Sequence, residues 1–158
     1  KGGVCMGKHA YLIIAHNHVK LLNQLLGVLD DPRNDIFLHI DAKTSDDYLA
    51  AIHKNLKYSP VRFSHRVSVQ WGGFSQISSE LSVLGTAVAT KHYDYYHLLS
   101  GADLPIKTQD QIHKFFDQQQ GMEFVQFQQP KISPEKLSRV MTNFIQQLNV
   151  FSRKHSAY

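Results

Sequence analysis

Apolar runs of strand length alternate with amphipathic stretches of helix length along this chain, and this order most limits the fold that it can adopt. Residues 9–15 form a continuous apolar run with β-branched Ile13 and Ile14, which is typical of a buried strand. Residues 19–29 then place leucines three and four positions apart, the spacing of one helical face. The alternation continues along the sequence, so it predicts an α/β domain with a mostly parallel, Rossmann-like sheet flanked by helices.

The other expected elements follow the same alternation. Further strands are predicted at residues 35–40, 61–65, 67–70, 95–99 and 123–127. Further helices are predicted at residues 44–56, 74–91 and 109–117, and a last one begins near Pro134. The side chains of the helix at 74–91 that are expected to face the core are Ile77, Leu81, Leu84 and Val88. The side chains of the strand at 95–99 that are expected to be buried are Tyr95, Tyr96, Leu98 and Leu99.

Composition fits one compact domain that does not bind nucleic acid. The 158 residues are 42% hydrophobic, which is enough for a core. The net charge of +4 comes from basic residues scattered along the chain, without the clustering that a nucleic-acid surface needs. Cys5 is the single cysteine, so it excludes an internal disulfide and favours a reducing compartment. Residues 1–7 are expected to be a leader or a remnant of expression, and no run reaches the ~18 apolar residues of a membrane span.

The segment at residues 97–106 carries the most informative local pattern. An apolar strand runs into a Ser-Gly turn that contains one acid, Asp103, and Pro105 keeps the preceding residue out of helical conformation. Gly101 is expected to permit the tight turn. Open α/β sheets bind ligands at the carboxyl edge, so Asp103 is a candidate contact for a sugar or a nucleotide. The alternative is that Asp103 only caps this turn or the helix that begins near Thr108.

Several common catalytic and binding patterns are absent. The sequence has no GxxxxGK[ST] or GxGxxG phosphate loop, no Gly-x-Ser-x-Gly elbow and no Asp-x-Asp pair for a divalent metal. The Gly72-Gly73 pair could bring backbone N–H groups to an anion, or it could serve a close crossing of strand and helix. His16 and His18 with Asp41 could form a divalent metal site, although paired histidines on a loop are more often simply polar.

Four blocks of sequence together resemble one enzyme family. They are residues 12–16 (LIIAH), 39–45 (HIDAKTS), 69–73 (VQWGG) and 99–108 (LSGADLPIKT). Their order and separations are similar to those of the core-2/I-branching N-acetylglucosaminyltransferases and peptide O-xylosyltransferases, glycosyltransferase family 14. The resemblance extends over residues 9–127. It implies a GT-A fold, with residues 8–158 as the N-terminal, nucleotide-sugar-binding part of a larger domain. It also implies inverting transfer of GlcNAc or xylose from a UDP-sugar to an acceptor hydroxyl, without a metal or other cofactor.

The resemblance also implies roles for individual residues. Those matched to the UDP-sugar site are Ile14, Ala15, His16, Asp41, Trp71, Ser100 and Asp103. Those matched to acceptor recognition are Glu123 and Lys131. A carboxylate such as Asp41 suits uracil N–H or ribose hydroxyl groups, and the flat face of Trp71 suits the nucleotide sugar. In simpler alternatives Asp41 caps the next helix, Trp71 belongs to the core, and His16 is a solvated loop residue.

The resemblance leaves the chemical step outside the matched region. The catalytic carboxylate of this family, and the basic residues that neutralise the departing UDP, lie further along the sequence, so we expect the base beyond Tyr158 and this chain alone to be inactive. Two alternatives stay open: a non-catalytic nucleotide-binding α/β domain, and a His/Asp metallohydrolase. The acceptor is expected to be a glycan or another hydroxyl compound. The expected location is the cytoplasm, peripheral to the membrane, as for synthesis of surface polysaccharide.

Overall fold

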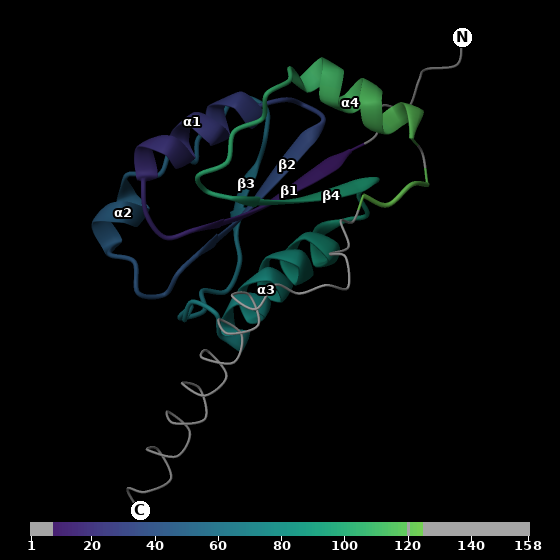
Figure 1. Ribbon diagram of the computed structural model, residues 1–158. Helices are drawn as coiled ribbons and strands as arrows, with labels where there is room; N and C mark the ends of the chain where they lie inside the picture. The colour runs from purple at the N-terminus through teal and green to yellow at the C-terminus, as the bar shows by residue number, and fades with distance from the viewer. Residues whose placement is uncertain (1–7, 120, 125–158) are drawn as a thin grey trace, which may run out of the picture.

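The computed structural model of the chain describes residues 8–119 and 121–124, which form a four-stranded parallel sheet with helices on both faces (Figure 1). The strands are β1 (His9–Ala15), β2 (Asn34–Ile40), β3 (Val61–Phe63) and β4 (Tyr95–Ser100). The helices are α1 (Val19–Leu29), α2 (Asp46–Ala50), α3 (Phe74–Thr90) and α4 (Gln109–Gln118). This arrangement confirms the predicted α/β class and its Rossmann-like, GT-A-like layout of a parallel sheet flanked by helices.

The order of the strands, β3-β2-β1-β4, creates a switch point between β1 and β4. The connection through α1 leads from β1 to β2 on one side, whereas α3 leads to β4 on the other side of β1. In the register of the sheet, Ile14 lies opposite both His39 and Ser100. The carboxyl ends of β1, β2 and β4 therefore meet at one edge, at the position where open α/β sheets bind ligands.

On one face of the sheet, α1 packs through the stripe that its sequence predicted. Its four fully buried residues are Leu22, Leu25, Leu26 and Leu29. They share an apolar cluster with strand residues that include Ile13 and Leu38. Each buried leucine contributes roughly 1.5–3 kcal/mol to folding, so this interface fixes α1 against the sheet.

On the opposite face, α3 turns a different stripe to the sheet than the sequence predicted. The buried residues of α3 are Ser79, Val83 and Ala87. Leu84 is partly buried at the border of the cluster. The prediction is wrong for three residues, which are exposed by half or more: Ile77, Leu81 and Val88. Small side chains let a helix approach a sheet closely, and hydrophobic spacing alone does not show which of two adjacent stripes makes that contact.

β4 is an edge strand within the described residues and is less buried than predicted. Its side chains alternate between half-buried and exposed, and Tyr96 and Leu98 are among the exposed ones. The half-buried side chains include Tyr95 and His97, whose rings pack against Phe116 of α4. This alternation is that of a strand covered on one face, so the prediction of buried side chains is wrong for Tyr96 and Leu98, whereas Tyr95 and Leu99 are half-buried.

Other expected elements differ in extent. Residues 67–70 form no strand, and the backbone N–H of Ala42 instead donates to the carbonyl of Val67 at 3.1 Å. The predicted helix at 44–56 is shortened to α2, and Glu123 and Phe124 are not in a strand. The rest of the strand expected at 123–127, the helix expected from Pro134, and residues 1–7 lie outside the described residues. Among the helices that the structure describes, none has the length and hydrophobicity to span a membrane.

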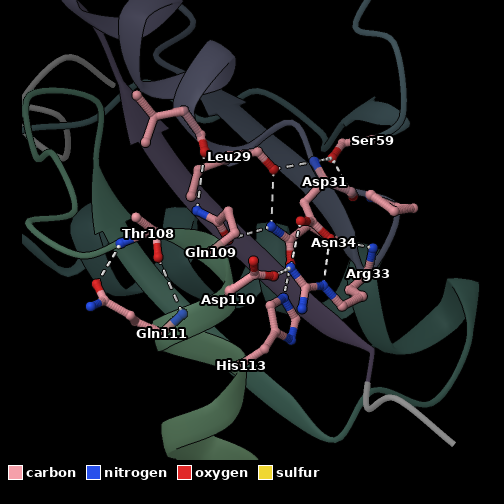
Figure 2. Close-up of polar contacts among 12 residues, drawn as sticks. Leu29, Asp31, Arg33, Asn34, Ser59, Thr108, Gln109, Asp110, Gln111 and His113 are labelled. Atoms are coloured by element: carbon pink, nitrogen blue, oxygen red, sulfur yellow. Dashed lines mark hydrogen bonds and ion pairs between the residues drawn. The ribbon is translucent and has the colours of Figure 1, made fainter.

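α4 covers the amino edge of the sheet through a polar network (Figure 2). Asn34, at the start of β2, donates from Nδ2 to Gln109 Oε1 at 2.8 Å. Its Oδ1 lies 2.9 Å from Nε2 of His113, which donates to it as the neutral ring. Arg33 reaches the carboxylate of Asp110 at 2.7 Å. These contacts attach α4 to the residues that enter β2.

Three histidines lie beneath α4 at the same edge. His9 and His113 are 0% and 2% exposed, with ring centroids 4.0 Å apart. The half-buried His97 lies with its Nε2 3.0 Å from Nδ1 of His9. Burial lowers the pKa of each of the three to about 4, and their mutual repulsion adds to it. At neutral pH all three are therefore uncharged and pack as aromatic groups.

Candidate functional site

A cavity of about 710 Å³ opens at the carboxyl edge of the sheet, at the ends of β1 and β4. Its walls come from the ends of three strands, from the segment before α3, and from the first turns of α3. The predicted donor-site residues that line it are Ile14, Ala15, His16, Asp41, Trp71 and Ser100. The structure therefore brings together side chains from four sequence blocks at the switch point of the fold.

Asp41 follows the last residue of β2 and is held by its own turn. Its N–H donates to the carbonyl of Ala15 at 3.1 Å, which continues the β1–β2 ladder by one residue. Its Oδ1 accepts from the backbone N–H of Lys43 at 2.8 Å. Its Oδ2 lies 3.7 Å from Nζ of Lys43, too far for a hydrogen bond. Ser45, not Asp41, caps α2, because Ser45 Oγ accepts from Tyr48 N.

Trp71 lies on the wall of the cavity and is 73% exposed, so it is not a core residue. The turn that presents it is fixed at both ends. Gly72 has φ 72°, a left-handed conformation that favours glycine, and its N–H donates to Gln76 Oε1 at 2.6 Å. The N–H of Gln70 donates to Ser75 Oγ at 2.7 Å. A large flat side chain is thus presented to the cavity by a turn that α3 anchors.

The ends of β1 and β4 lie in close contact on the other side of the cavity. Gly101 N donates to the carbonyl of Ile14 at 2.8 Å. A Cβ placed on Gly101 would lie 2.6 Å from the Cβ of Ala15, well inside van der Waals contact. Glycine is therefore required here by the close approach of β1, which is a different reason from the tight turn expected from the sequence. His16, the residue after β1, is exposed in the loop that follows the strand.

Asp103 borders the cavity and does not line it. Its Oδ2 accepts from the backbone N–H of Ser100 at 2.7 Å, and its own N–H donates to the Ser100 carbonyl at 3.1 Å. The acid therefore holds the turn after β4, as the simpler alternative proposed. Thr108 caps α4 in a reciprocal bond pair with Gln111, so Asp103 is not that cap. Contact of Asp103 with a donor sugar stays a prediction.

The remaining predicted residues lie elsewhere. Glu123 is exposed beside Phe124, whose ring contacts Tyr95 at the amino end of β4, so Glu123 is remote from the cavity. Lys131 lies outside the described residues. His18 lines a separate depression at the start of α1, whereas His16 lines the cavity. Over residues 8–119 and 121–124, no three His, Cys, Asp or Glu side chains are placed to hold a metal ion. The metallohydrolase alternative therefore has no site in this region.

The cavity is also lined by polar residues to which the sequence blocks gave no role. Gln76, Ser79 and Glu80 of α3 line it, as does Lys43. Lys43 extends over the cavity wall, where its Nζ donates to the carbonyl of Val69 at 2.5 Å. A signal for the helical residues was present, since positions 76, 79 and 80 share one face at a spacing of three and four. The wall therefore carries both signs of charge, from Asp41 and Glu80 and from Lys43.

Comparison with known proteins identifies similar sequences. The sequence model of the core-2/I-branching enzyme family matches residues 9–157. A human beta-1,3-galactosyl-O-glycosyl-glycoprotein beta-1,6-N-acetylglucosaminyltransferase is 32% identical over 102 residues, covering 63% of this chain and 24% of the relative. A human N-acetyllactosaminide beta-1,6-N-acetylglucosaminyl-transferase is 28% identical over 109 residues, covering 67% and 27%. Xylosyltransferase oxt of Drosophila melanogaster is 27% identical over 109 residues, covering 68% and 12%. The chain thus spans about a quarter, or less, of the length of these relatives.

Proposed function

The chain belongs to the core-2/I-branching enzyme family, and on that premise we propose that it forms the donor-binding part of an inverting glycosyltransferase. The donor is a UDP-sugar that carries GlcNAc or xylose, because relatives named for each of these sugars resemble the chain. One observation carries the proposal. The blocks that resemble the family converge on a single cavity at the switch point of the sheet.

The proposed binding mode follows from the chemistry of the cavity wall. The uracil and ribose lie against the end of β1 at Ile14 and His16, where the Asp41 carboxylate accepts their hydrogen bonds. The 3.7 Å separation from Lys43 leaves Oδ2 of Asp41 able to take a ligand N–H or O–H at shorter distance. Trp71 offers an apolar face to the donor sugar, a favourable contact for the C–H groups of a pyranose.

The proposed reaction is a single displacement at the anomeric carbon. The acceptor oxygen bonds to this carbon as its bond to the diphosphate oxygen breaks, and the electron pair leaves with UDP. The acceptor proton passes to a carboxylate that we place beyond Tyr158, together with the basic groups that neutralise the leaving diphosphate. Residues 8–119 bind and position the donor. The acceptor is a glycan or another hydroxyl compound.

We further propose that transfer proceeds without a metal ion. The cavity wall offers two carboxylates, Asp41 and Glu80, on different elements. Neither belongs to an Asp-x-Asp pair, which is the arrangement that bridges a divalent cation to a diphosphate. A transfer assay with excess EDTA tests this point: undiminished turnover supports the proposal, and loss that Mn²⁺ or Mg²⁺ restores would contradict it. A cytoplasmic location at the membrane surface likewise stays a prediction.

Calorimetry on the intact protein tests the donor site. We expect UDP to bind and ADP to bind far more weakly, because the uracil edge is what Asp41 recognises. Asp41→Asn should weaken UDP binding by about 1–3 kcal/mol, through loss of charge-assisted hydrogen bonds. Asp46→Asn is the matched control, since Asp46 is an exposed acid on α2 outside the cavity.

Two outcomes would contradict this account. Equal affinity for UDP and ADP would remove the uridine assignment. UDP binding with no transfer of GlcNAc or xylose to a panel of glycan and hydroxyl acceptors would instead support the alternative, a non-catalytic nucleotide-binding domain. The proposal predicts that Asp41→Asn diminishes transfer and that Asp46→Asn leaves it intact.

A further inference from the structure

The irregular segment at residues 64–71, which leads from β3 to Trp71, is attached to the end of β2 by backbone contacts. Ser64 N donates to the carbonyl of Leu38 at 2.9 Å, and Ala42 N donates to the carbonyl of Val67 at 3.1 Å. These bonds continue the direction of the sheet without forming a strand. The segment therefore runs alongside the turn that carries Asp41, on its way to the cavity wall.

Arg66 adds a connection of a different kind. Its Nη2 donates to the carbonyl of Asp41 at 2.8 Å and to the carbonyl of Thr44 at 2.7 Å. Its Nε donates to the carbonyl of Ile40 at 3.3 Å. No carboxylate forms an ion pair with Arg66 among the residues that the structure describes. The guanidinium instead spans the backbone of the turn that presents Asp41 to the cavity.

His39 connects the same two segments from inside the sheet. It is fully buried in β2, and its Nε2 accepts from the backbone N–H of Val67 at 2.9 Å. The ring proton must therefore lie on Nδ1, which fixes the neutral tautomer. Burial lowers the pKa of His39, so this acceptor is retained at neutral pH.

We propose that Arg66 is a positioning residue of the donor site. By binding the backbone of residues 40–44, it holds Asp41 at a fixed separation from Trp71. His39 supports the same placement through its hydrogen bond with Val67 N. This inference rests on the proposed function for the identity of the ligand. It assigns a role to two residues that do not line the cavity. Misplacement of binding groups by about 1 Å can cost up to about 100-fold in rate, so a backbone anchor behind the site has a measurable effect.

Arg62, just before this segment, provides a matched control. It lies in β3, four residues before Arg66, and pairs with Asp35 at 3.1 Å through Nη1. Asp35 lies near the amino end of β2, remote from the cavity. Loss of either arginine removes polar contacts to β2: Arg62 bonds Asp35 near its amino end, and Arg66 bonds Ile40 at its carboxyl end. Only loss of Arg66 disturbs the turn at 40–44.

The experiment compares Arg66→Ala, Arg66→Lys and Arg62→Ala in the intact protein. The readouts are the melting temperature, UDP affinity, KM for donor and acceptor, and hydrogen exchange of the peptides that cover residues 40–44 and 66–71. We expect Arg66→Ala to weaken UDP binding about 10- to 100-fold, to raise the donor KM with the acceptor KM unchanged, and to speed exchange in both peptides. Lysine can keep one carbonyl contact, so Arg66→Lys should recover part of the affinity. Arg62→Ala should lower the melting temperature but leave UDP affinity within about twofold.

The readouts separate failure of this inference from failure of the proposed function. If the wild-type protein does not bind UDP, the proposed function fails, and the exchange data still test the anchor. If Arg66→Ala leaves exchange at 40–44 and 66–71 unchanged, the positioning role is wrong whatever the ligand is. If Arg62→Ala weakens UDP binding as much as Arg66→Ala does, the effect is one of general stability and the inference is overturned.

Discussion

At the amino edge of the sheet, polar side chains pair with one another beneath α4, whereas at the carboxyl edge they line an open cavity. Asn34 and His113 are buried and bonded, as Figure 2 shows for Asn34, Gln109 and His113. At the opposite edge Trp71 is 73% exposed and the side chain of Lys43 is 59% exposed. Both edges are formed by the same three strands, β1, β2 and β4. The difference separates a closed edge that stabilises the fold from an open edge that is available to a ligand.

Acidification should affect the closed edge most. His9, His97 and His113 have pKa values near 4 when folded and an ordinary value of 6.5, so the unfolded chain binds more protons between these values. The contribution of these three neutral rings to the free energy of unfolding should be fully present above pH 6.5 and decrease as the pH drops toward 4. Protonation of one ring disfavours protonation of its neighbours, so we expect a loss on the order of 3–6 kcal/mol in the free energy of unfolding, seen as a fall in melting temperature.

A variant pair tests whether the histidines cause this loss. His113→Gln keeps a donor for Asn34 Oδ1 and removes one titrating ring, so its stability should change less between pH 6.5 and 4. His53→Gln replaces an exposed histidine and should follow the wild-type curve. A wild-type melting temperature that does not change over this range would contradict the account of the amino edge.

Gly101→Ala should have the next largest effect, and it acts at the open edge. The added Cβ would lie 2.6 Å from the Cβ of Ala15, so the ends of β1 and β4 must separate. We expect a loss of about 1–3 kcal/mol in the free energy of unfolding, together with weaker UDP binding. Gly85→Ala is the control, since a Cβ there meets nothing within 4 Å and should stabilise α3 by about 0.5–1 kcal/mol. Equal stability of the two variants in urea unfolding would contradict the close contact.

Trp71→Ala should have the smallest effect on stability. The side chain is 73% exposed, so the melting temperature should shift by no more than about 2 °C, while UDP-sugar affinity falls several-fold. Phe74→Ala is a fair comparison, because Phe74 is 69% exposed and does not line the cavity. If Trp71→Ala unfolds the protein, or if Phe74→Ala weakens the donor equally, Trp71 is not a specific wall of the site.

The elements predicted best from the sequence are those with strong local signals. Residues 19–29 form a helix with the predicted inward leucines, because one apolar stripe allows one orientation. The extent of α3 was predicted closely, but its inward face was not, because its contact with the sheet is made by small side chains. The exposure of β4 depends on what packs beside it, and residue spacing does not contain that information.

The site shows the same division. Asp41 and Ser100 were assigned through the resemblance to the family, and the structure places both on the cavity wall, each at the end of an apolar strand. Arg66 was not assigned, because its partners are carbonyl groups brought near by the fold, and no side-chain pattern marks them. His9 and His113 lie far apart in the sequence, and only the docking of α4 brings their rings to 4.0 Å.

Hydrogen exchange of the intact protein with and without UDP tests the central claim most directly. The claim is that the carboxyl edge binds the nucleotide and the amino edge does not. We predict that UDP slows exchange in the peptides that cover residues 14–17, 40–44, 69–73 and 99–102, which surround the cavity. Exchange in α4 and at residues 31–36 should stay unchanged. Protection of α4 with no change around the cavity would contradict the account.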